Sequence, residues 1–231
     1  VFNKKLYTNL IPDCPGGGTV SWTNPWGGHK YIDNIEDRED GGTPGFLQVI
    51  KTALAIQLKE EMGIENMLHR EHEIVESIFE SLGDTPSIKI LAAKHQDRVG
   101  VFYFYIDDLH FNLGVKLRND KFGIQTRGGC SCAGTYGHFL LHVDQETSHK
   151  LIDEITLGDL IRKPGWIRMS IHPTTTTAEI EFVCNGIKEL AKNHVQWALD
   201  YEYNKDSNEF INKNAEPLED ELVKKWFSIK N

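Results

Sequence analysis

The spacing of apolar residues along the chain predicts three long helices. The first follows a Thr43-Pro44 turn and ends near Gly63, with apolar residues three and four positions apart. Thr43 is the expected N-cap of this helix, and one face is expected to be buried. The apolar positions on that face are Phe46, Val49, Ile50, Ala53, Leu54 and Leu58.

The other two long helices are expected later in the chain. One covers residues 66–82 and is followed by Gly83, a residue type that is common just past a helix end. The other begins with the capping-box pattern Thr176-x-x-Glu179 and continues to about Trp197. The expected inward residues are Ile74, Val75, Ile78 and Phe79 in the first of these, and Ile180, Val183, Ile187, Leu190, Ala191 and Val195 in the second.

Short apolar runs between the long helices predict strands. The run 99–106 is apolar on both faces and is therefore expected at the centre of a sheet. Further strands are predicted at 88–91, 123–126 and 165–171, and a shorter helix at 109–119. Strands that alternate with helices indicate an α/β fold or an α+β sandwich layer.

The two ends of the chain have a different composition. Residues 1–40 are rich in Gly, Pro, Trp and Asn, which predicts loops with a short strand around 19–22. After Tyr201 the sequence becomes polar except for one apolar patch at 222–229. This tail is expected either to be disordered or to dock a short helix.

Composition and charge limit the classes of partner. The 231 residues, 39% of them hydrophobic, can form one large core or two small ones. With 34 acidic and 25 basic residues the net charge is -9 and no Lys/Arg-rich run occurs, which argues against nucleic acid or an anionic membrane surface. The longest apolar run, 99–106, falls far short of the roughly 20 residues of a membrane helix. The four cysteines are too sparse for a secreted disulfide scaffold, so we expect a cytoplasmic protein.

Three short motifs have the chemistry to bind small anions. Gly41-Gly42-Thr43-Pro44 opens a predicted helix, whose N-terminus favours a phosphate. Residues 127–133 read Arg-Gly-Gly-Cys-Ser-Cys-Ala, and 166–174 read Trp-Ile-Arg-Met-Ser-Ile-His-Pro-Thr. A guanidinium pairs with a carboxylate through two parallel hydrogen bonds, so Arg127 and Arg168 are candidate carboxylate ligands.

The order of these motifs resembles the class V aminotransferases, a family that includes cysteine desulfurases and selenocysteine lyases. The matching residues run from Pro15-Gly-Gly-Gly-Thr19 through Glu39–Pro44 and Arg127, with Cys132 five residues later, to Arg168-x-Ser170. The resemblance extends from near residue 1 to about residue 199. It implies a pyridoxal 5'-phosphate enzyme, a transferase or lyase that acts on an amino acid and pairs as a homodimer with shared active sites.

The resemblance also implies a domain organisation. Residues 1–65 would be the C-terminal remnant of the cofactor-binding large domain, residues 66–200 the small C-terminal domain, and residues 201–231 the polar tail. In the family the lysine that forms the Schiff base lies in a Ser-x-His-Lys type motif upstream of the glycine-rich stretch, and none precedes that stretch here. Lys30 in His29-Lys30 falls on the wrong side and is expected to be a solvated loop lysine. The chain is therefore expected to be a fragment, inactive without its N-terminal segment, with apolar surface exposed in residues 1–60.

Roles for individual residues follow from the resemblance. Arg127 and Arg168 would bind the substrate carboxylate, and Cys132 would be the nucleophile that attacks substrate sulfur. Gly42 and Thr43 would contact the cofactor phosphate, in related enzymes that of the neighbouring subunit. The alternatives are ion-paired surface arginines and an ordinary N-cap.

Two departures from the family leave other functions open. Cys130 adds a second thiol to the loop, and about thirty residues separate Gly134 from Trp166. Transamination and sulfur removal both stay open. An alternative is a non-catalytic interaction module or a zinc site, since Cys130, Cys132, His138 and His142 supply four nitrogen or sulfur ligands within thirteen residues.

Overall fold

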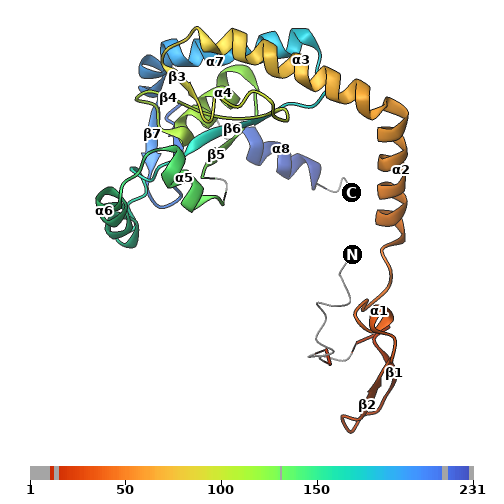
Figure 1. Ribbon diagram of the computed structural model, residues 1–231. Helices are drawn as coiled ribbons and strands as arrows, with labels where there is room; N and C mark the ends of the chain where they lie inside the picture. The colour runs from red at the N-terminus through yellow and green to blue at the C-terminus, as the bar shows by residue number, and fades with distance from the viewer. Residues whose placement is uncertain (1–10, 13–15, 131, 215–217, 229–231) are drawn as a thin grey trace. The chain divides into compact units, whose positions relative to one another are not determined.

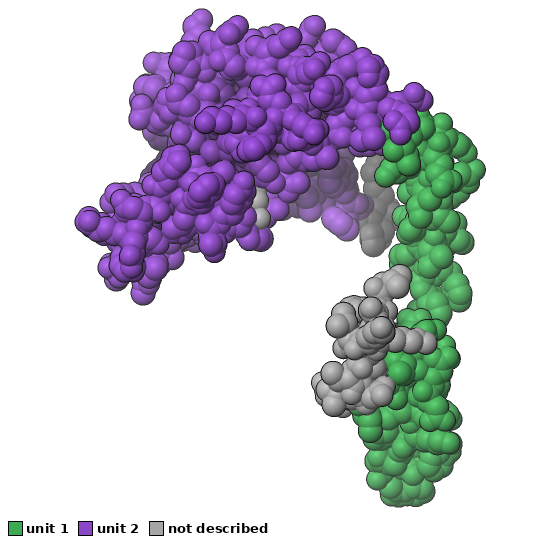
Figure 2. Space-filling view, in the orientation of Figure 1, with its two compact units in different colours: residues 1–64 green, residues 65–231 purple. Residues whose placement is uncertain are grey.

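The computed structural model describes residues 11–12, 16–130, 132–214 and 218–228. Cys14 and Pro15 of the glycine-rich stretch lie outside the described residues. The chain divides into two compact units, Val1–Ile64 (unit 1) and Glu65–Asn231 (unit 2), which Figure 2 shows in separate colours. No helix in the described part of the chain is both long and apolar enough to cross a membrane.

Unit 1 contains a β-hairpin formed by β1 (Val20–Thr23) and β2 (His29–Tyr31). Its turn is closed by Asn24, whose side-chain oxygen accepts hydrogen bonds from the backbone N–H groups of Trp26 (3.0 Å) and Gly28 (2.8 Å). The predicted short strand corresponds to β1, whereas β2 and the one-turn helix α1 (Ile35–Arg38) were not predicted.

The long helix of unit 1, α2 (Phe46–Met62), ends at Gly63 as predicted, but two other expectations for it are wrong. Its N-cap is Gly45 rather than Thr43, because the Pro44 carbonyl accepts from the N–H of Phe46 (2.9 Å) and delays the first helical turn. None of its residues is buried: Leu47 is 74% exposed and Val49 67%. The other described elements of unit 1 are too small to cover this helix, so the apolar exposure expected for residues 1–60 is observed.

The core of unit 2 is built on a four-stranded antiparallel sheet in the order β3-β4-β6-β5 (Figure 1). The strands are β3 (Ile88–Ile90), β4 (Val101–Ile106), β5 (Arg127–Gly129) and β6 (Trp166–Ser170). The strand predicted at the centre, β4, does lie inside the sheet. Its burial alternates, with Phe102, Phe104 and Ile106 in the core, so only one of its faces is fully covered.

Three helices pack against the core face of the sheet. They are α3 (Ile64–Gly83), α4 (Phe111–Phe122) and α7 (Thr177–Ala198). Full burial of an aliphatic side chain contributes about 1.5–3 kcal/mol, so the side chains that these helices share with β4 and β6 dominate the stability of unit 2. The most deeply buried apolar residues of the three helices are Ile74, Val75, Ile78, Leu82, Leu117, Ile180, Cys184, Ile187 and Leu190.

Helix α7 begins with the predicted capping box. The Thr176 hydroxyl accepts from the N–H of Glu179 (3.3 Å), and the Glu179 carboxylate accepts from the N–H of Thr176 (2.8 Å). One inward residue was assigned wrongly, since Val195 is 70% exposed and its neighbour His194 is buried. His194 continues the three-to-four-residue spacing from Ile187 and Leu190, and Val195 falls outside it.

The strand predicted at 123–126 is also wrong, because Gly123 caps α4 and residues 124–126 form the connection from α4 to β5. Gly123 adopts the left-handed conformation (φ 66°) that closes the helix, and the N–H of Ile124 donates to the carbonyl of Arg118 (3.2 Å). The strand begins only at Arg127.

The remaining elements of unit 2 lie outside the four-stranded sheet. Helix α5 (Gly134–Leu140) packs on the side chain of Trp166, against which Gly137 lies so closely that a Cβ there would be 3.3 Å from the indole ring. Helix α6 (Gln145–Thr156) follows it. The polar tail contains a hairpin that was not predicted, formed by β7 (Tyr201–Asn204) and β8 (Glu209–Asn212), and the short helix α8 (Leu218–Trp226).

Candidate functional site

The two candidate arginines are direct neighbours on adjacent strands. Arg127 of β5 and Arg168 of β6 are paired across the antiparallel ladder, and Tyr103 of β4 is paired with Arg168 on the other side. Directly paired residues project from the same face of a sheet. Because Ile167 and Met169 project into the core, the row Tyr103–Arg168–Arg127 projects from the opposite face.

The environment of Arg168 leaves a hydrogen-bond donor without an acceptor. Its guanidinium lies 5.9 Å from the centre of the Tyr103 ring, and its Nε is buried with no hydrogen-bond partner in the described part of the chain. A buried N–H without an acceptor costs about 1–3 kcal/mol, a cost that an anionic ligand would remove. Among the described residues neither Arg168 nor Arg127 forms a salt bridge with an acidic side chain, so the ion-paired alternative is not observed.

Cys132 lies beside this pair. Its Sγ is 4.0 Å from Nη2 of Arg127, and the residue is exposed. The backbone of Cys132 has φ 61°, a left-handed conformation that is uncommon for a residue with a side chain. The hydrogen bond from the N–H of Ala133 to the carbonyl of Cys130 (2.8 Å) closes the turn that holds it. A cation therefore faces the sulfur atom that would carry negative charge as a nucleophile.

The second thiol of the loop is in a different environment. Cys130 is half-buried, and its Sγ donates to the carbonyl of Pro164 (2.9 Å). Burial raises the pKa of the Cys130 thiol, which disfavours its reactive thiolate. The two thiols of the Cys-x-Cys sequence thus differ, with Cys132 accessible and Cys130 held in its neutral form.

Cys130 and Cys132 both line a pocket of about 550 Å³. His138 of α5 lies in its wall, with Nδ1 2.8 Å from the carbonyl of Gly134 and Nε2 2.9 Å from the hydroxyl of Ser148. The carbonyl can only accept, so Nδ1 carries the proton and Nε2 accepts from Ser148. Sequence reasoning missed this pocket because its walls come from α4, α5, α6 and the β7–β8 turn, which are far apart along the chain.

The zinc hypothesis is not supported. No group of three or more His, Cys, Asp or Glu side chains suitable for a metal ion occurs within the described residues. Both ring nitrogens of His138 are already engaged, and Cys130 donates to Pro164. His142 has a left-handed backbone (φ 53°) just after α5 instead of continuing the same helix face.

Gly42 and Thr43 lie in unit 1, and they differ in whether they have a hydrogen-bond donor free to bind an anion. The N–H of Gly42 donates to the carbonyl of Gly17 (2.7 Å) and is therefore not free. The Thr43 hydroxyl is exposed and makes no hydrogen bond to the described residues. The N–H of Phe46 is engaged by the Pro44 carbonyl, but Gly45 gives α2 no side-chain cap, so the next N–H groups of the first turn keep the anion-binding capacity of a helix N-terminus.

Comparison with known proteins identifies a family. The family model described as Aminotransferase class-V matches residues 1–183. A probable cysteine desulfurase from Synechocystis sp. is 25% identical over 134 residues, which are 57% of this chain and 31% of the relative. A cysteine desulfurase from Haloferax volcanii is 26% identical over 127 residues, 50% of this chain and 30% of the relative. The chain thus spans about a third of the length of the curated relatives it matches.

Solved structures show the same fold. The cysteine desulfurase from Thermococcus onnurineus NA1 matches with a TM-score of 0.55 and 23% identity, over 79% of this chain and 40% of that protein. A cysteine desulfurase from Escherichia coli matches with a TM-score of 0.54 and 18% identity, over 79% of this chain and 39% of that protein. These matches confirm the predicted α/β fold class.

Proposed function

The chain belongs to the class V aminotransferase family, and we propose that it supplies the substrate-carboxylate arginines and the reactive thiol of a pyridoxal-phosphate enzyme that acts on an amino acid. One observation carries the proposal: Arg127 and Arg168 are paired across β5 and β6, with Cys132 Sγ 4.0 Å from Arg127. Two cations and a thiol within one small region match a substrate that has a carboxylate at one end and a sulfur or selenium atom at the other.

Arg168 is the main carboxylate ligand in this proposal. Its position next to Tyr103 restricts the guanidinium, and its unpartnered Nε gains an acceptor when a carboxylate binds. Arg127, on the exposed edge strand, has more freedom and lies closer to the thiol. Its guanidinium can contact the substrate carboxylate or a negative charge on the Cys132 sulfur. Arg127 therefore lies between the proposed carboxylate site at Arg168 and the thiol.

The position of Cys132 favours sulfur removal over transamination as the reaction of this enzyme. An exposed thiol beside a guanidinium has no evident task in moving an amino group, whereas it can accept a sulfur or selenium atom from the substrate. We therefore place the chain with the cysteine desulfurase and selenocysteine lyase branch of the family, as the curated relatives also suggest. Cys130, held neutral by burial, does not share this role.

The cofactor would be held in part by Thr43 and the open N-terminus of α2, which fit a phosphate group. Pyridoxal phosphate supplies the electron sink that makes bonds at the amino-acid α-carbon and side chain labile. Lys30 lies exposed on the small β1–β2 hairpin, so we do not assign it as the lysine that binds the cofactor covalently. In this proposal that lysine belongs to an N-terminal segment outside residues 1–231. The chain would then need its N-terminal segment for activity, and a second subunit would complete the active site.

Kinetics of the cofactor-loaded enzyme that contains this chain test the proposal. Arg168→Gln should raise KM for cysteine or selenocysteine at least 10-fold, since a charge-assisted hydrogen bond contributes about 1.5–3 kcal/mol. Cys132→Ser should abolish release of sulfur or selenium and leave amino-acid binding intact. Cys130→Ser is the matched control and should retain most of the activity. Unchanged KM in Arg168→Gln, or full turnover in Cys132→Ser, would refute the assignment.

A further inference from the structure

We propose that the free edge of β5, together with the groove beside it, binds an extended peptide as an added antiparallel strand. β5 (Arg127–Gly129) is the last strand of the sheet, and within the described residues it pairs with β6 alone. The backbone N–H and C=O groups on its other edge are available for a further strand. This inference concerns a binding surface and does not depend on the proposed catalytic function.

Two hollows are lined in part by residues of β5 and by the residues on either side of it. One, of about 770 Å³, is lined by Gln125 and Thr126, which lead into the strand. The other, of about 550 Å³, is lined by Gly128, Gly129, Cys130 and Cys132. Asn112 and Asn208 line both hollows and are joined by a 2.6 Å hydrogen bond from Asn112 Nδ2 to the Asn208 carbonyl. The hollows are therefore neighbours along one groove.

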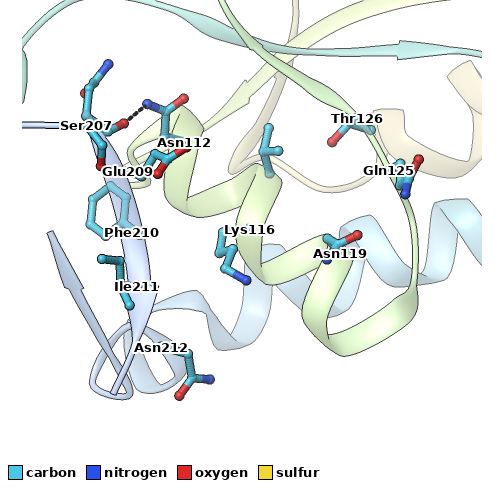
Figure 3. A pocket seen from close by; sticks show the side chains of 12 residues that line it. Asn112, Lys116, Asn119, Gln125, Thr126, Ser207, Glu209, Phe210, Ile211 and Asn212 are labelled. Atoms are coloured by element: carbon cyan, nitrogen blue, oxygen red, sulfur yellow. Dashed lines mark hydrogen bonds between the residues drawn. The ribbon is translucent and has the colours of Figure 1, made fainter. Parts of the chain in front are cut away.

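The larger hollow has the form of a trough (Figure 3). One face of α4 contributes side chains at helical spacing, and the opposite wall is formed by consecutive residues of the β7–β8 turn and β8. Lys116 and Asn119 project from the helix between Gln125 and Thr126 on one side and β8 on the other. The α4 residues are Asn112, Val115, Lys116 and Asn119, and the β8 wall is residues 207–212.

The lining of the trough suits a peptide better than a charged small molecule. It contains the amide side chains of Asn112, Asn119, Gln125, Asn208 and Asn212, which can both donate and accept. Of its two charged residues, Lys116 is already paired with Asp120 (2.9 Å) and Glu209 has the opposite sign. The groove thus offers no concentrated charge, and its donors and acceptors match those of peptide groups and uncharged polar side chains.

A buried hydroxyl in the trough lacks a partner. Thr126 lines the hollow, and its Oγ1 is buried without a hydrogen bond to any described residue. An unsatisfied buried polar atom costs about 1–3 kcal/mol, which a ligand in the groove would recover. Together with the free strand edge, this orphan hydroxyl indicates a ligand with hydrogen-bonding groups close to the start of β5.

The geometry also sets the direction of the peptide. Every pairing in the sheet is antiparallel, and antiparallel pairing is slightly more stable per residue than parallel pairing. A peptide antiparallel to β5 begins near Cys132 and ends near Gln125. Pairing with positions 125–129 takes five residues, and one further residue at the peptide's N-terminus leads towards Cys132, so about six are needed.

Disulfide capture by Cys132 provides the test. The full chain carries Cys14→Ser and Cys130→Ser, which leave Cys132 and the buried Cys184. The probe is the N-acetylated peptide Cys-Thr-Gln-Thr-Gln-Thr amide, equilibrated with the protein in a buffer of fixed thiol-to-disulfide ratio, whose disulfide is reduced as the adduct forms. The adduct is measured by intact mass. Two control peptides are N-methylated at one or the other set of alternate residues, so that each lacks the backbone donors of one edge.

Strand addition predicts that one set of N-methyl groups weakens capture at least 10-fold while the other changes it less than 2-fold, because only one edge of the peptide faces β5. Amide hydrogen exchange of residues 125–129 should slow in the unmethylated adduct. Equal capture of all three peptides, or equal loss with both methylated sets, would overturn the proposal. Neither readout requires cofactor or turnover, so failure here is distinct from failure of the proposed function.

Discussion

Arg118 is the least expected residue of the core. It is 0% exposed, its guanidinium lies 5.6 Å from the Phe104 ring, and Nη2 is 3.9 Å from the Met169 sulfur. Its Nε and Nη1 have no partner within the described residues. Burial lowers the pKa of Arg118 to about 10, so the side chain is still charged at neutral pH. A buried charge without an acidic partner is a burden on stability.

Replacement of this arginine should therefore stabilise the protein. Arg118→Met keeps a long side chain and removes the charge, and we expect the free energy of unfolding to rise by about 1–3 kcal/mol. Urea denaturation at pH 7 measures this change. Arg162→Met is the control, because Arg162 is exposed and paired with Glu154 (2.8 Å), and it should shift stability by less than about 0.5 kcal/mol. A loss of stability in Arg118→Met would mean that the charge has a partner or role not seen here.

Asp120 makes stability depend on pH. Burial alone would raise the pKa of its carboxyl, but hydrogen bonds from Lys116 (2.9 Å), Tyr201 (2.7 Å) and Asn119 (3.2 Å) outweigh burial and lower that pKa. Its contribution is therefore present above the unfolded pKa of about 4 and is lost as pH falls through the lower folded value. For Tyr201, burial and the bond to Asp120 raise the pKa to about 12, so its contribution is lost as pH rises above about 10.

Asp120→Asn should unfold more easily than the parent at pH 7, by about 1 kcal/mol. The difference should shrink as pH falls below about 4 and through the lower folded-state pKa, because protonation removes the charge that strengthens these hydrogen bonds. Urea midpoints of both proteins at pH 7 and pH 2 provide the comparison. A difference that persists unchanged at pH 2 would contradict the assigned hydrogen-bond network.

At the scale of elements, α2 stands out because its apolar side chains are exposed. Leu47, Ile50 and Leu54 are 74%, 55% and 60% exposed, so replacing all three by Lys should change the unfolding free energy by less than about 1 kcal/mol. Binding of an apolar fluorescent dye should fall in this variant because a contiguous apolar surface is removed. Val195→Lys, an isolated change at a 70% exposed position, should alter neither property. A large loss of stability in the triple variant would show that α2 is packed after all.

The sequence predicted those elements whose signals are local. The capping box of Thr176 and Glu179 and the amphipathic spacing of α3 and α7 located helices within a few residues. Predictions failed where residues next to an apolar pattern imposed a different backbone conformation on it. Ile124 and Thr126 resemble a strand, but Gly123 ends α4 in a left-handed turn and draws Ile124 back to the helix.

At the scale of the whole molecule, the candidate site depends on strand register. The sequence marks Arg127 and Arg168 as candidates, but they are separated by the whole of α5 and α6. Only the pairing of β5 with β6 places them opposite each other, and a shift of one residue would turn one of them towards the core. The pocket beside the thiol loop could not be predicted for the same reason, since His138 and Ser148 lie on different helices.

The residues assigned to the substrate and to the cofactor lie in different units of the chain. The arginines and the thiol lie in unit 2, while the candidate phosphate contact at Thr43 lies in unit 1. The central claim is that the two arginines and Cys132 form one anion-binding site. All three residues lie in unit 2, so substitutions in unit 2 of the whole chain are enough to test it. It needs neither cofactor nor the remaining two thirds of the relatives' length.

The most direct measurement is the rate of Cys132 alkylation by iodoacetate relative to iodoacetamide, at low ionic strength and with peptide mapping to assign the thiol. The arginines should attract the carboxylate reagent, so the rate ratio should be roughly 3-fold higher in the parent chain than in Arg127→Gln or Arg168→Gln. Arg162→Gln is the control: the charge of Arg162 is already paired with Glu154 (2.8 Å), so its loss should leave the ratio unchanged. Equal ratios in all four proteins would show that the arginines and Cys132 do not form one site.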